Sequence, residues 1–407
     1  MTKEIRCADC GPNFVHHRLQ YTSARLEWML LPMVSWTEGL WKKIRPIAYI
    51  LPVHKVLIPL FKFLHFTRIS KIVTHSKDEA DGRSKCFWEE AERRGIEMYK
   101  FHFINSSHVT KGVFVANING KKIIFDTLPR PGGNHSPSIE WMDDKAVMRK
   151  KFKAAGLPIA RGGCASSFKE ALEIFNSIGG EVIVKPRTGS RSRHTTTYIT
   201  TPEALKIAYD KAKQLSPWVV VEEQLRGLVF RVTLIGGKVI AIMRREPPYV
   251  VGDGVSTLQE LINEENKHPA RKGPVFHEIV LDEEGWGELK RQNLTMESVP
   301  EKGRFVALGQ KIGRGSGGST SDATENVHPE NIKLFEKIGA YLQDPLVGVD
   351  FIIEDMTRPW QEQMPCGVIE CNSLPFIDLH HFPMRGEIKN TASALWDYVL
   401  SYYSQKN

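Results

Sequence analysis

Three oxygen-bearing side chains in the C-terminal part of the chain have the spacing of a magnesium site. Glu370 and Asn372 lie two residues apart in VIECN, so on a strand they point to the same face. Asp350 belongs to an earlier predicted strand, and it faces them if the two strands pair as antiparallel neighbours through the loop around Pro359. Two carboxylates and an amide oxygen suit Mg²⁺, a hard cation that keeps coordination positions for water and phosphate oxygens. Polar strand ends facing water are the alternative.

A second set of residues carries positive charge. Lys145 follows Asp143 and Asp144 at a helix start, and Lys185 ends an apolar run before Pro186. A lysine that emerges from a buried strand needs an anionic partner. The glycine-rich run GRGSGGS (313–319) has exposed N–H groups that suit phosphate, although a flexible surface loop would look the same. Arginines also follow Lys185, among them Arg187, Arg191, Arg193, Arg231, Arg244 and Arg245.

These residues lie on an alternating pattern of helices and strands. Asp144 caps a helix that ends at Gly156, and Ser167 with Glu170 predicts a capping box for the next one. Proline in the first turn starts another helix at Thr201-Pro202, and Gly236-Gly237 predicts a hairpin. The last predicted elements are a helix over 329–342 and strands over 346–353 and 368–371.

The first 140 residues differ from the rest. Residues 1–77 form a predicted basic, apolar helical region, with no acidic residue between Glu38 and Asp78. We expect residues 78–140 to form a small α/β region, with a hairpin at Asn119-Gly120 and a linker over 128–138. The basic stretch 39–77 is too interrupted to span a membrane. It fits helices packed on the rest of the chain or at a subunit interface, and the less favoured alternative is peripheral contact with an anionic membrane surface.

From Trp141 to about Tyr398 the order of motifs resembles the ATP-grasp superfamily. The likeness is to the ATP-grasp part of cyanophycin synthetase and of bifunctional glutathione synthetases, and more distantly to D-alanine–D-alanine ligase. It implies an α+β fold in which two α/β subdomains clamp ATP, with the domain at 141–407, its lid at about 145–228 and its metal-binding core at about 229–407. The matching stretches include DKAVMRKKFKAAGLPIARG, EVIVKP, VVVEEQLRG, FRVTLIGGKVIAIMRREPPYVVGDGVSTLQELI, SGGSTSDATENVHPEN, GVDFI and VIECNSLPFIDLHHFP.

The resemblance implies a ligase that activates a carboxylate of an amino acid or peptide as an acyl phosphate and joins it to an amine. Its cofactors would be ATP and Mg²⁺, with Mn²⁺ as an alternative metal. By position, ATP would be held by Lys145, Lys185, Glu222, Glu223, Arg191 and Arg193, the metal by Asp350, Glu370 and Asn372, and the reacting groups by Arg231, Arg245 and Arg271. His380-His381, just after the metal strand, fits either substrate contact or a supporting role.

Some positions depart from the family pattern. Ser192 and His194 stand where the small phosphate loop has glycines, Val229 stands where an acid would grip ribose, and Gly313 replaces an asparagine. The metal triad and both lysines are intact, which favours altered substrate or nucleotide handling over loss of activity. A non-catalytic or regulatory nucleotide-binding protein, and a membrane-surface protein that uses its basic N-terminus, are the alternatives.

Composition sets broader limits. The chain has 407 residues, 41% hydrophobic residues and a net charge of +8, ordinary for a globular protein and compatible with phosphate-rich ligands. Its six irregularly spaced cysteines and the absence of an apolar signal core predict a cytoplasmic protein. We expect a homo-oligomer with small-molecule partners and no nucleic acid. Cys7 and Cys10, with His16 and His17, have only partial zinc-like spacing, because a second ligand pair is missing.

Overall fold

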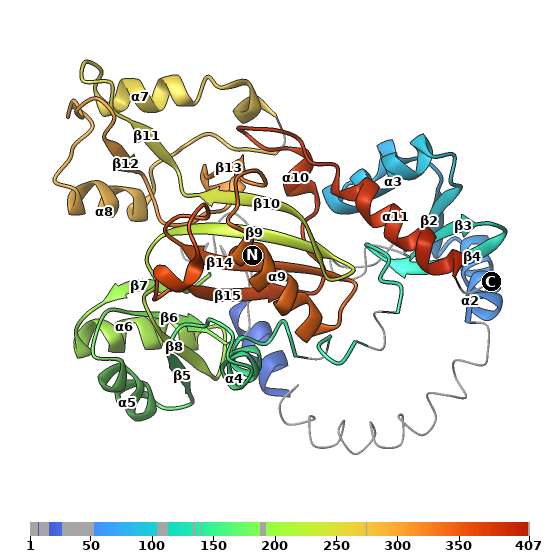
Figure 1. Ribbon diagram of the computed structural model, residues 1–407, viewed down its shortest axis with the longest axis horizontal. Coiled ribbons are helices and arrows are strands. Elements are labelled where there is room, and N and C mark those ends of the chain that lie inside the picture. The colour runs from blue at the N-terminus through green and yellow to red at the C-terminus, as the bar shows by residue number, and fades with distance from the viewer. Residues whose placement is uncertain are drawn as a thin grey trace, which may run out of the picture.

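The computed structural model describes residue 7 and residues 16–26, 53–103, 113–132, 136–139, 141–187, 193–273 and 275–405. Its helices pack on sheets whose strand pairs are all antiparallel, which confirms the predicted α+β class. Figure 1 shows the largest sheet at the centre, a smaller sheet with two helices on one side of it, and a third α/β unit at one end.

The central sheet has five strands in the order β13-β10-β9-β14-β15. Alternating apolar residues of β9 and β14, such as Val232 and Val349, face the main core, where Phe335 of α9 packs at right angles to Phe351. The opposite face carries the polar residues of the same strands. The elements are β9 (Leu228–Ile235), β10 (Lys238–Glu246), β13 (Ser319–Asp322), α9 (Pro329–Leu342), β14 (Leu346–Ile353) and β15 (Gly367–Asn372).

Local sequence signals fixed several of these elements. Gly236 and Gly237, both with positive φ, form the turn of the predicted β9–β10 hairpin. Helix α9 and strand β14 coincide with the predicted ranges, and β15 extends the predicted strand by one residue at each end.

The region expected to form the lid, called the lid from here on, contains a four-stranded sheet in the order β5-β8-β6-β7, covered by α5 and α6. Ser167 caps α5 as predicted, but the Glu170 carboxylate accepts from Ser166 N rather than from the cap residue itself. Thr201 caps α6, with Pro202 in its first turn. The elements are α4 (Lys145–Ala154), β5 (Gly162–Ala165), α5 (Phe168–Ile178), β6 (Val182–Pro186), β7 (Thr196–Ile199), α6 (Pro202–Lys213) and β8 (Val219–Glu223).

The third unit combines elements from residues 53–126 with the C-terminal helix α11. Strand β1 lies before residue 77 and pairs with β2 beyond it, so one sheet, β1-β2-β3-β4, crosses the boundary that the sequence suggested. Trp396 of α11 stacks on Phe87 of α3 with ring centroids 4.3 Å apart and donates from Nε1 to the Phe87 carbonyl at 2.9 Å. The elements are α2 (Val53–Phe66), β1 (Ser70–Val73), α3 (Gly82–Arg93), β2 (Met98–Phe103), β3 (Val113–Ile118), β4 (Lys121–Asp126) and α11 (Thr391–Ser404).

Other features complete the architecture. The predicted hairpin at Asn119-Gly120 is present, with both residues at positive φ. The described part of the predicted linker is packed against the domain, since Arg130 pairs with the buried Asp344 and Ser138 is fully buried. A two-stranded sheet with α7 and α8 surrounds a small core of its own. Its elements are β11 (Tyr249–Val251), α7 (Leu258–Glu265), α8 (Glu283–Arg291) and β12 (Phe305–Ala307). None of the described helices has the length and apolar character needed to cross a bilayer.

Candidate active site

Charged side chains form a row across three adjacent strands of the central sheet. Asp350 on β14 is in register with Arg231 on β9 on one side and with Glu370 on β15 on the other. Directly opposed residues in antiparallel strands point to the same face, so all three side chains share the face away from the α9 core. The antiparallel pairing of the two strands around the Pro359 loop, expected from the sequence, is therefore present.

Asp350 is deeply buried and held by two arginines. Arg231 donates from Nε to Oδ1 at 2.5 Å and from Nη2 to Oδ2 at 2.9 Å, and Arg245 Nη1 lies 3.3 Å from Oδ2. Burial raises the pKa of the Asp350 carboxyl, but the positive charges of Arg231 and Arg245 outweigh it and hold this pKa below its usual value. Asp350 is therefore an anion that keeps two guanidinium groups aimed at this face of the sheet.

Glu370 and Asn372 lie beside this cluster and differ from Asp350 in their surroundings. The Glu370 side chain is 28% exposed, and its Oε1 lies 3.5 Å from Lys145 Nζ. The Asn372 amide nitrogen is buried without a hydrogen-bond partner among the described residues. Two carboxylates and one amide, brought together from β14 and β15, form an oxygen donor set that fits Mg²⁺. Any ion there would share the Asp350 oxygens with Arg231 and Arg245.

A pocket with about 720 Å³ of empty space lies between the lid sheet and the edge of the central sheet. Six of the site residues predicted from the sequence line this pocket: Lys145, Lys185, Arg193, Glu222, Glu223 and Glu370. Lys185 Nζ lies 2.6 Å from Glu222 Oε2, so the buried lysine at the end of β6 has the anionic partner that its position required. This pocket is the candidate nucleotide site.

Two arginines that were not predicted as site residues, Arg149 and Arg161, contact residues that line this pocket. Arg149 on α4 donates from Nη2 to the Ala160 carbonyl at 2.8 Å, and its Nε lies 3.9 Å from Glu222. Glu223 accepts from Arg161 N and Nε, both at 2.7 Å, which fixes the strand end next to the pocket. Arg149 follows Lys145 by four residues, so the helical i, i+4 rule was the signal that could have identified it.

Arg191, expected to contact ATP, and its neighbour Ser192 lie outside the described residues. Val229, at the position expected to grip ribose, is in register with Arg245 and borders a different pocket with Arg244. No acidic side chain occupies position 229, and an apolar side chain cannot accept a hydrogen bond from a ribose hydroxyl.

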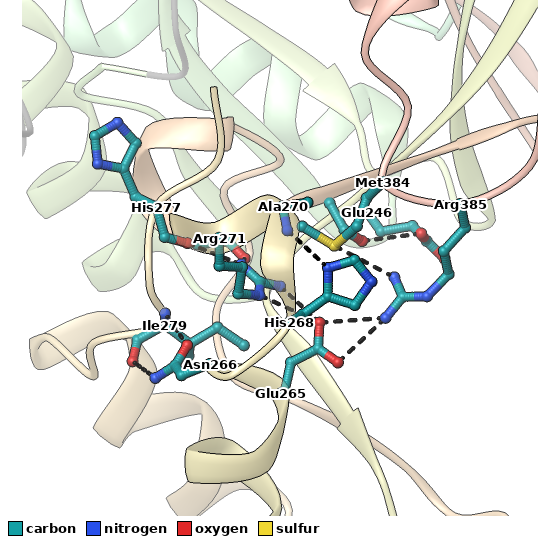
Figure 2. Close-up of polar contacts among 12 residues, drawn as sticks. Glu246, Glu265, Asn266, His268, Ala270, Arg271, His277, Ile279, Met384 and Arg385 are labelled. Carbon is teal, nitrogen blue, oxygen red and sulfur yellow. Dashed lines mark hydrogen bonds and ion pairs between the residues drawn. The ribbon is translucent and has the colours of Figure 1, made fainter. Parts of the chain in front are cut away.

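Arg271 does not line the first pocket. Figure 2 shows its guanidinium beside the Glu265 carboxylate, which Arg385 also contacts. Its buried guanidinium donates to Glu265 Oε1 from Nε at 3.2 Å and from Nη2 at 3.0 Å, and from Nη1 to the His277 and Gly317 carbonyls at 2.8 and 2.9 Å. Arg385 binds the same Glu265 carboxylate at 3.2 Å. Arg271 thus fastens the glycine-rich loop at Gly317, and it lines a second, larger pocket beside that loop.

Several guanidinium groups on the site face retain unused donors. Among the described residues, Arg231 Nη1, Arg245 Nε and Arg314 Nη1 are buried without a hydrogen-bond partner. Arg314, in the glycine-rich loop, also donates to Asp378 at 2.8 Å, so its position is fixed. Buried donors without acceptors are costly, and an anionic ligand would satisfy them. The sequence analysis missed Arg314 because it treated the loop as a backbone cradle.

His380 contacts a neutral side chain on the same face of the sheet. Its Nε2 lies 2.7 Å from Thr233 Oγ1, and the side chain is fully buried. Burial, together with the nearby charge of Arg231, lowers the pKa of His380 to about 3. The imidazole is therefore neutral at physiological pH, and of the two roles that the sequence allowed, the contact with Thr233 favours the supporting one.

The architecture described above is the α+β ATP-grasp fold, as comparison with a solved structure shows. A structural relative, the bifunctional glutathione synthetase from Pasteurella multocida, superposes with a TM-score of 0.54 at 24% identity and covers 79% of this chain and 43% of its own. No family model matches the sequence.

In sequence, the chain is similar to ATP-grasp ligases. It is 32% identical over 265 residues to cyanophycin synthetase from Trichormus variabilis, and this alignment covers 64% of this chain and 29% of the relative. It is 28% identical over 269 residues to the glutathione biosynthesis bifunctional protein of Clostridium perfringens, covering 64% of this chain and 34% of the relative. The match thus spans about a third of the length of these relatives, and it confirms the resemblance found from the motifs.

Proposed function

We propose that the chain is an ATP-dependent carboxylate–amine ligase. In the proposed reaction a carboxylate of an amino acid or peptide attacks the γ-phosphorus of ATP, which gives an acyl phosphate and ADP. An amine then displaces phosphate and forms an amide. The observation that carries the proposal is the row Arg231–Asp350–Glu370, whose Glu370 end lines a pocket together with Lys145 and Lys185. Relatives with this sequence pattern are named as cyanophycin synthetase and as a glutathione biosynthesis protein.

Each charged group has a role set by its place. Lys185, from the lid, and Lys145, at the N-terminus of α4, both line the pocket and would supply positive charge to the phosphates. Arg245 and Arg231 lie next to Asp350 with a spare N–H each, which suits the carboxylate and the oxyanion formed when the amine attacks. The glycine-rich loop, fastened through Arg271 and Arg314, would exclude water from the acyl phosphate.

The proposed metal ligands are Asp350, Glu370 and Asn372. When bound there, Mg²⁺ would neutralise phosphate charge during transfer. Glu370 is the more accessible of the two carboxylates and would contribute most to metal binding alone. Asp350 also forms ion pairs with Arg231 and Arg245.

The decisive experiment measures phosphate release from ATP over pairs of amino acids and short peptides, with mass spectrometry of the products. A ligase gives Mg²⁺-dependent phosphate release that requires both a carboxylate and an amine, together with a product whose mass equals the two substrates minus water. A non-catalytic nucleotide-binding protein, which Val229 favours, binds ATP and gives neither.

A peripheral contact through residues 39–77 is the second candidate property. It is supported by α2, where Leu60, Phe63 and Phe66 are exposed. Lys62 on the helix and Arg68 just beyond it supply positive charge. An anionic membrane surface and a second copy of the chain are the two candidate partners for this face. Liposome flotation and light scattering on the full chain distinguish them.

A further inference from the structure

A cluster of metal-ligating side chains lies away from the magnesium site. Cys7, His17 and His194 come from the N-terminal segment, from the helix over residues 17–26 and from the lid, and one ligand atom of each lies within 4.8 Å of the others. Cys7 Sγ and His194 Nε2 are 3.5 Å apart although 187 residues separate them in sequence. The rings of His17 and His194 meet edge to face with centroids 4.8 Å apart.

His194 is prepared for this contact by its other ring nitrogen. Its Nδ1 lies 2.8 Å from the carbonyl oxygen of Lys211. A carbonyl oxygen only accepts, so Nδ1 carries the proton and the lone pair of Nε2 points toward Cys7. A histidine fixed in this way by a backbone carbonyl is the common arrangement for metal-binding imidazoles.

The backbone at His194 is also unusual. Its φ is +52°, a left-handed conformation that side chains with a Cβ adopt rarely, and the side chain is almost completely buried. Glycine adopts this conformation without strain, and other residues do so at a cost. A buried histidine held in a strained conformation indicates that its side chain has a use.

We propose that Cys7, His17 and His194 bind a structural zinc ion that fastens the N-terminal segment to the lid. Thiolate and imidazole ligands together suit Zn²⁺. At tetrahedral angles, Zn–S and Zn–N bonds of normal length put sulfur and nitrogen about 3.6 Å apart, close to the observed Cys7–His194 separation. Binding releases the Cys7 thiol proton to solvent, and water or another donor completes the coordination. Cys10, paired with Cys7 in the sequence analysis, lies outside the described residues.

The site would act on the nucleotide pocket through its neighbours. Arg193, next to His194, lines that pocket, and Cys7 lines the second pocket beside Arg271 and the glycine-rich loop. Zinc would thus hold the His194 end of the lid loop against the N-terminal segment. This explains why His17 and His194 are close together without any role for either in the proposed ligase reaction.

The test is zinc content and cobalt spectroscopy of the full chain. The purified protein should carry a single zinc ion, and the cobalt-substituted protein should show a thiolate-to-cobalt charge-transfer band. Cys7→Ser should abolish the band. Cys7→Ser, His17→Ala and His194→Gly should each weaken zinc binding by more than the roughly 10- to 100-fold that loss of an outer hydrogen-bond partner costs. His194→Gly suits the left-handed backbone, so this variant should fold.

Matched controls separate a zinc site from a packed cluster. His16 is exposed and accepts from Leu19 N at 3.4 Å, and Cys164 lies outside the cluster, so His16→Ala and Cys164→Ser should keep zinc at the parent level. Thermal melts should show that every variant compared is folded. A parent protein that takes up no zinc from an equimolar solution, or zinc retained in both Cys7→Ser and His194→Gly, would overturn the proposal.

Discussion

Arg231 and Asp350 form a two-pronged ion pair between neighbouring strands, with Nε–Oδ1 and Nη2–Oδ2 distances of 2.5 and 2.9 Å. Both residues are almost completely buried. The pair therefore gives Asp350 two duties, because the carboxylate that would bind Mg²⁺ also neutralises a buried arginine. Glu370, in register with it on the other side, has no such duty toward a buried arginine, and this difference separates the first two predictions.

Glu370→Gln should leave the fold intact and remove most turnover. Glutamine keeps the size of the side chain but not the charge that a magnesium ligand supplies, so we expect Mg²⁺-dependent phosphate release to fall about 100-fold or more. Glu362→Gln is the matched control, since Glu362 is exposed and lies 3.9 Å from Arg358, away from the site. Near-parental turnover of Glu370→Gln at limiting Mg²⁺ would show that the metal site is wrongly assigned.

Asp350→Asn should lose both turnover and stability. The amide leaves the Arg231 guanidinium buried without a counter-charge, and breaking a buried pair in this way costs about 3 kcal/mol or more in the free energy of unfolding. Urea denaturation, compared with Glu370→Gln, measures this difference. The losses of turnover in the two variants should not add in the double variant, since both disrupt one site. Equal stabilities of the two single variants would contradict the assigned division of roles.

Lys185→Ala should weaken ATP binding. The lysine borders the nucleotide pocket, and a charged hydrogen bond contributes about 1.5–3 kcal/mol, which corresponds to roughly 10- to 150-fold in the dissociation constant. Calorimetry on folded protein measures the change. Lys206→Ala, an exposed lid lysine paired with Asp210, should bind ATP as the parent does. Unchanged ATP affinity in Lys185→Ala would exclude the phosphate role. Because Lys185 also neutralises Glu222, its loss should lower the melting temperature as well.

Stability should fall as the pH drops below 6.5, owing to His380. Its pKa is lowered from 6.5 to about 3 in the folded protein, chiefly by burial, so between these values the unfolded chain binds the proton that the folded chain does not. The free energy of unfolding then rises with pH in this window, by up to about 1.4 kcal/mol per pH unit. His380→Gln should flatten the slope above pH 4.5, where most carboxylates are still ionised. His381, whose pKa is also lowered by burial, should leave a residual slope. A slope unchanged in His380→Gln would refute this account.

Replacing Phe63 and Phe66 with serine should reduce peripheral association without unfolding the protein. The two side chains are 61% and 84% exposed on α2, so they contribute little to the core. Ile58 of the same helix is buried against Phe101 and is left unchanged. Flotation with anionic liposomes and light scattering would show whether membrane binding or self-association decreases. If neither changes, this face of α2 is not a contact surface.

Local signals in the sequence were sufficient for many elements. Caps at Asp144 and Thr201, the glycine pair at the β9–β10 turn and the alternation in VFRVTLI are short-range features whose physical effect does not depend on distant residues. The i, i+2 spacing of Glu370 and Asn372 is a short-range feature of the same kind. The boundary at residue 77 was less secure, because strand pairing between β1 and β2 leaves no local mark in composition.

The sequence by itself determined the kinds of groups available and their order along the chain: two lysines, a carboxylate pair with an amide, and motifs that resemble ATP-grasp ligases. The tertiary structure decided which of these groups meet. The pairing of Arg231 with Asp350, the use of Arg271 to hold a loop carbonyl, and the approach of His194 to Cys7 join residues up to 187 positions apart. Such contacts depend on sheet register and on the packing of the lid, which no local pattern encodes, because they arise only when distant segments are buried together.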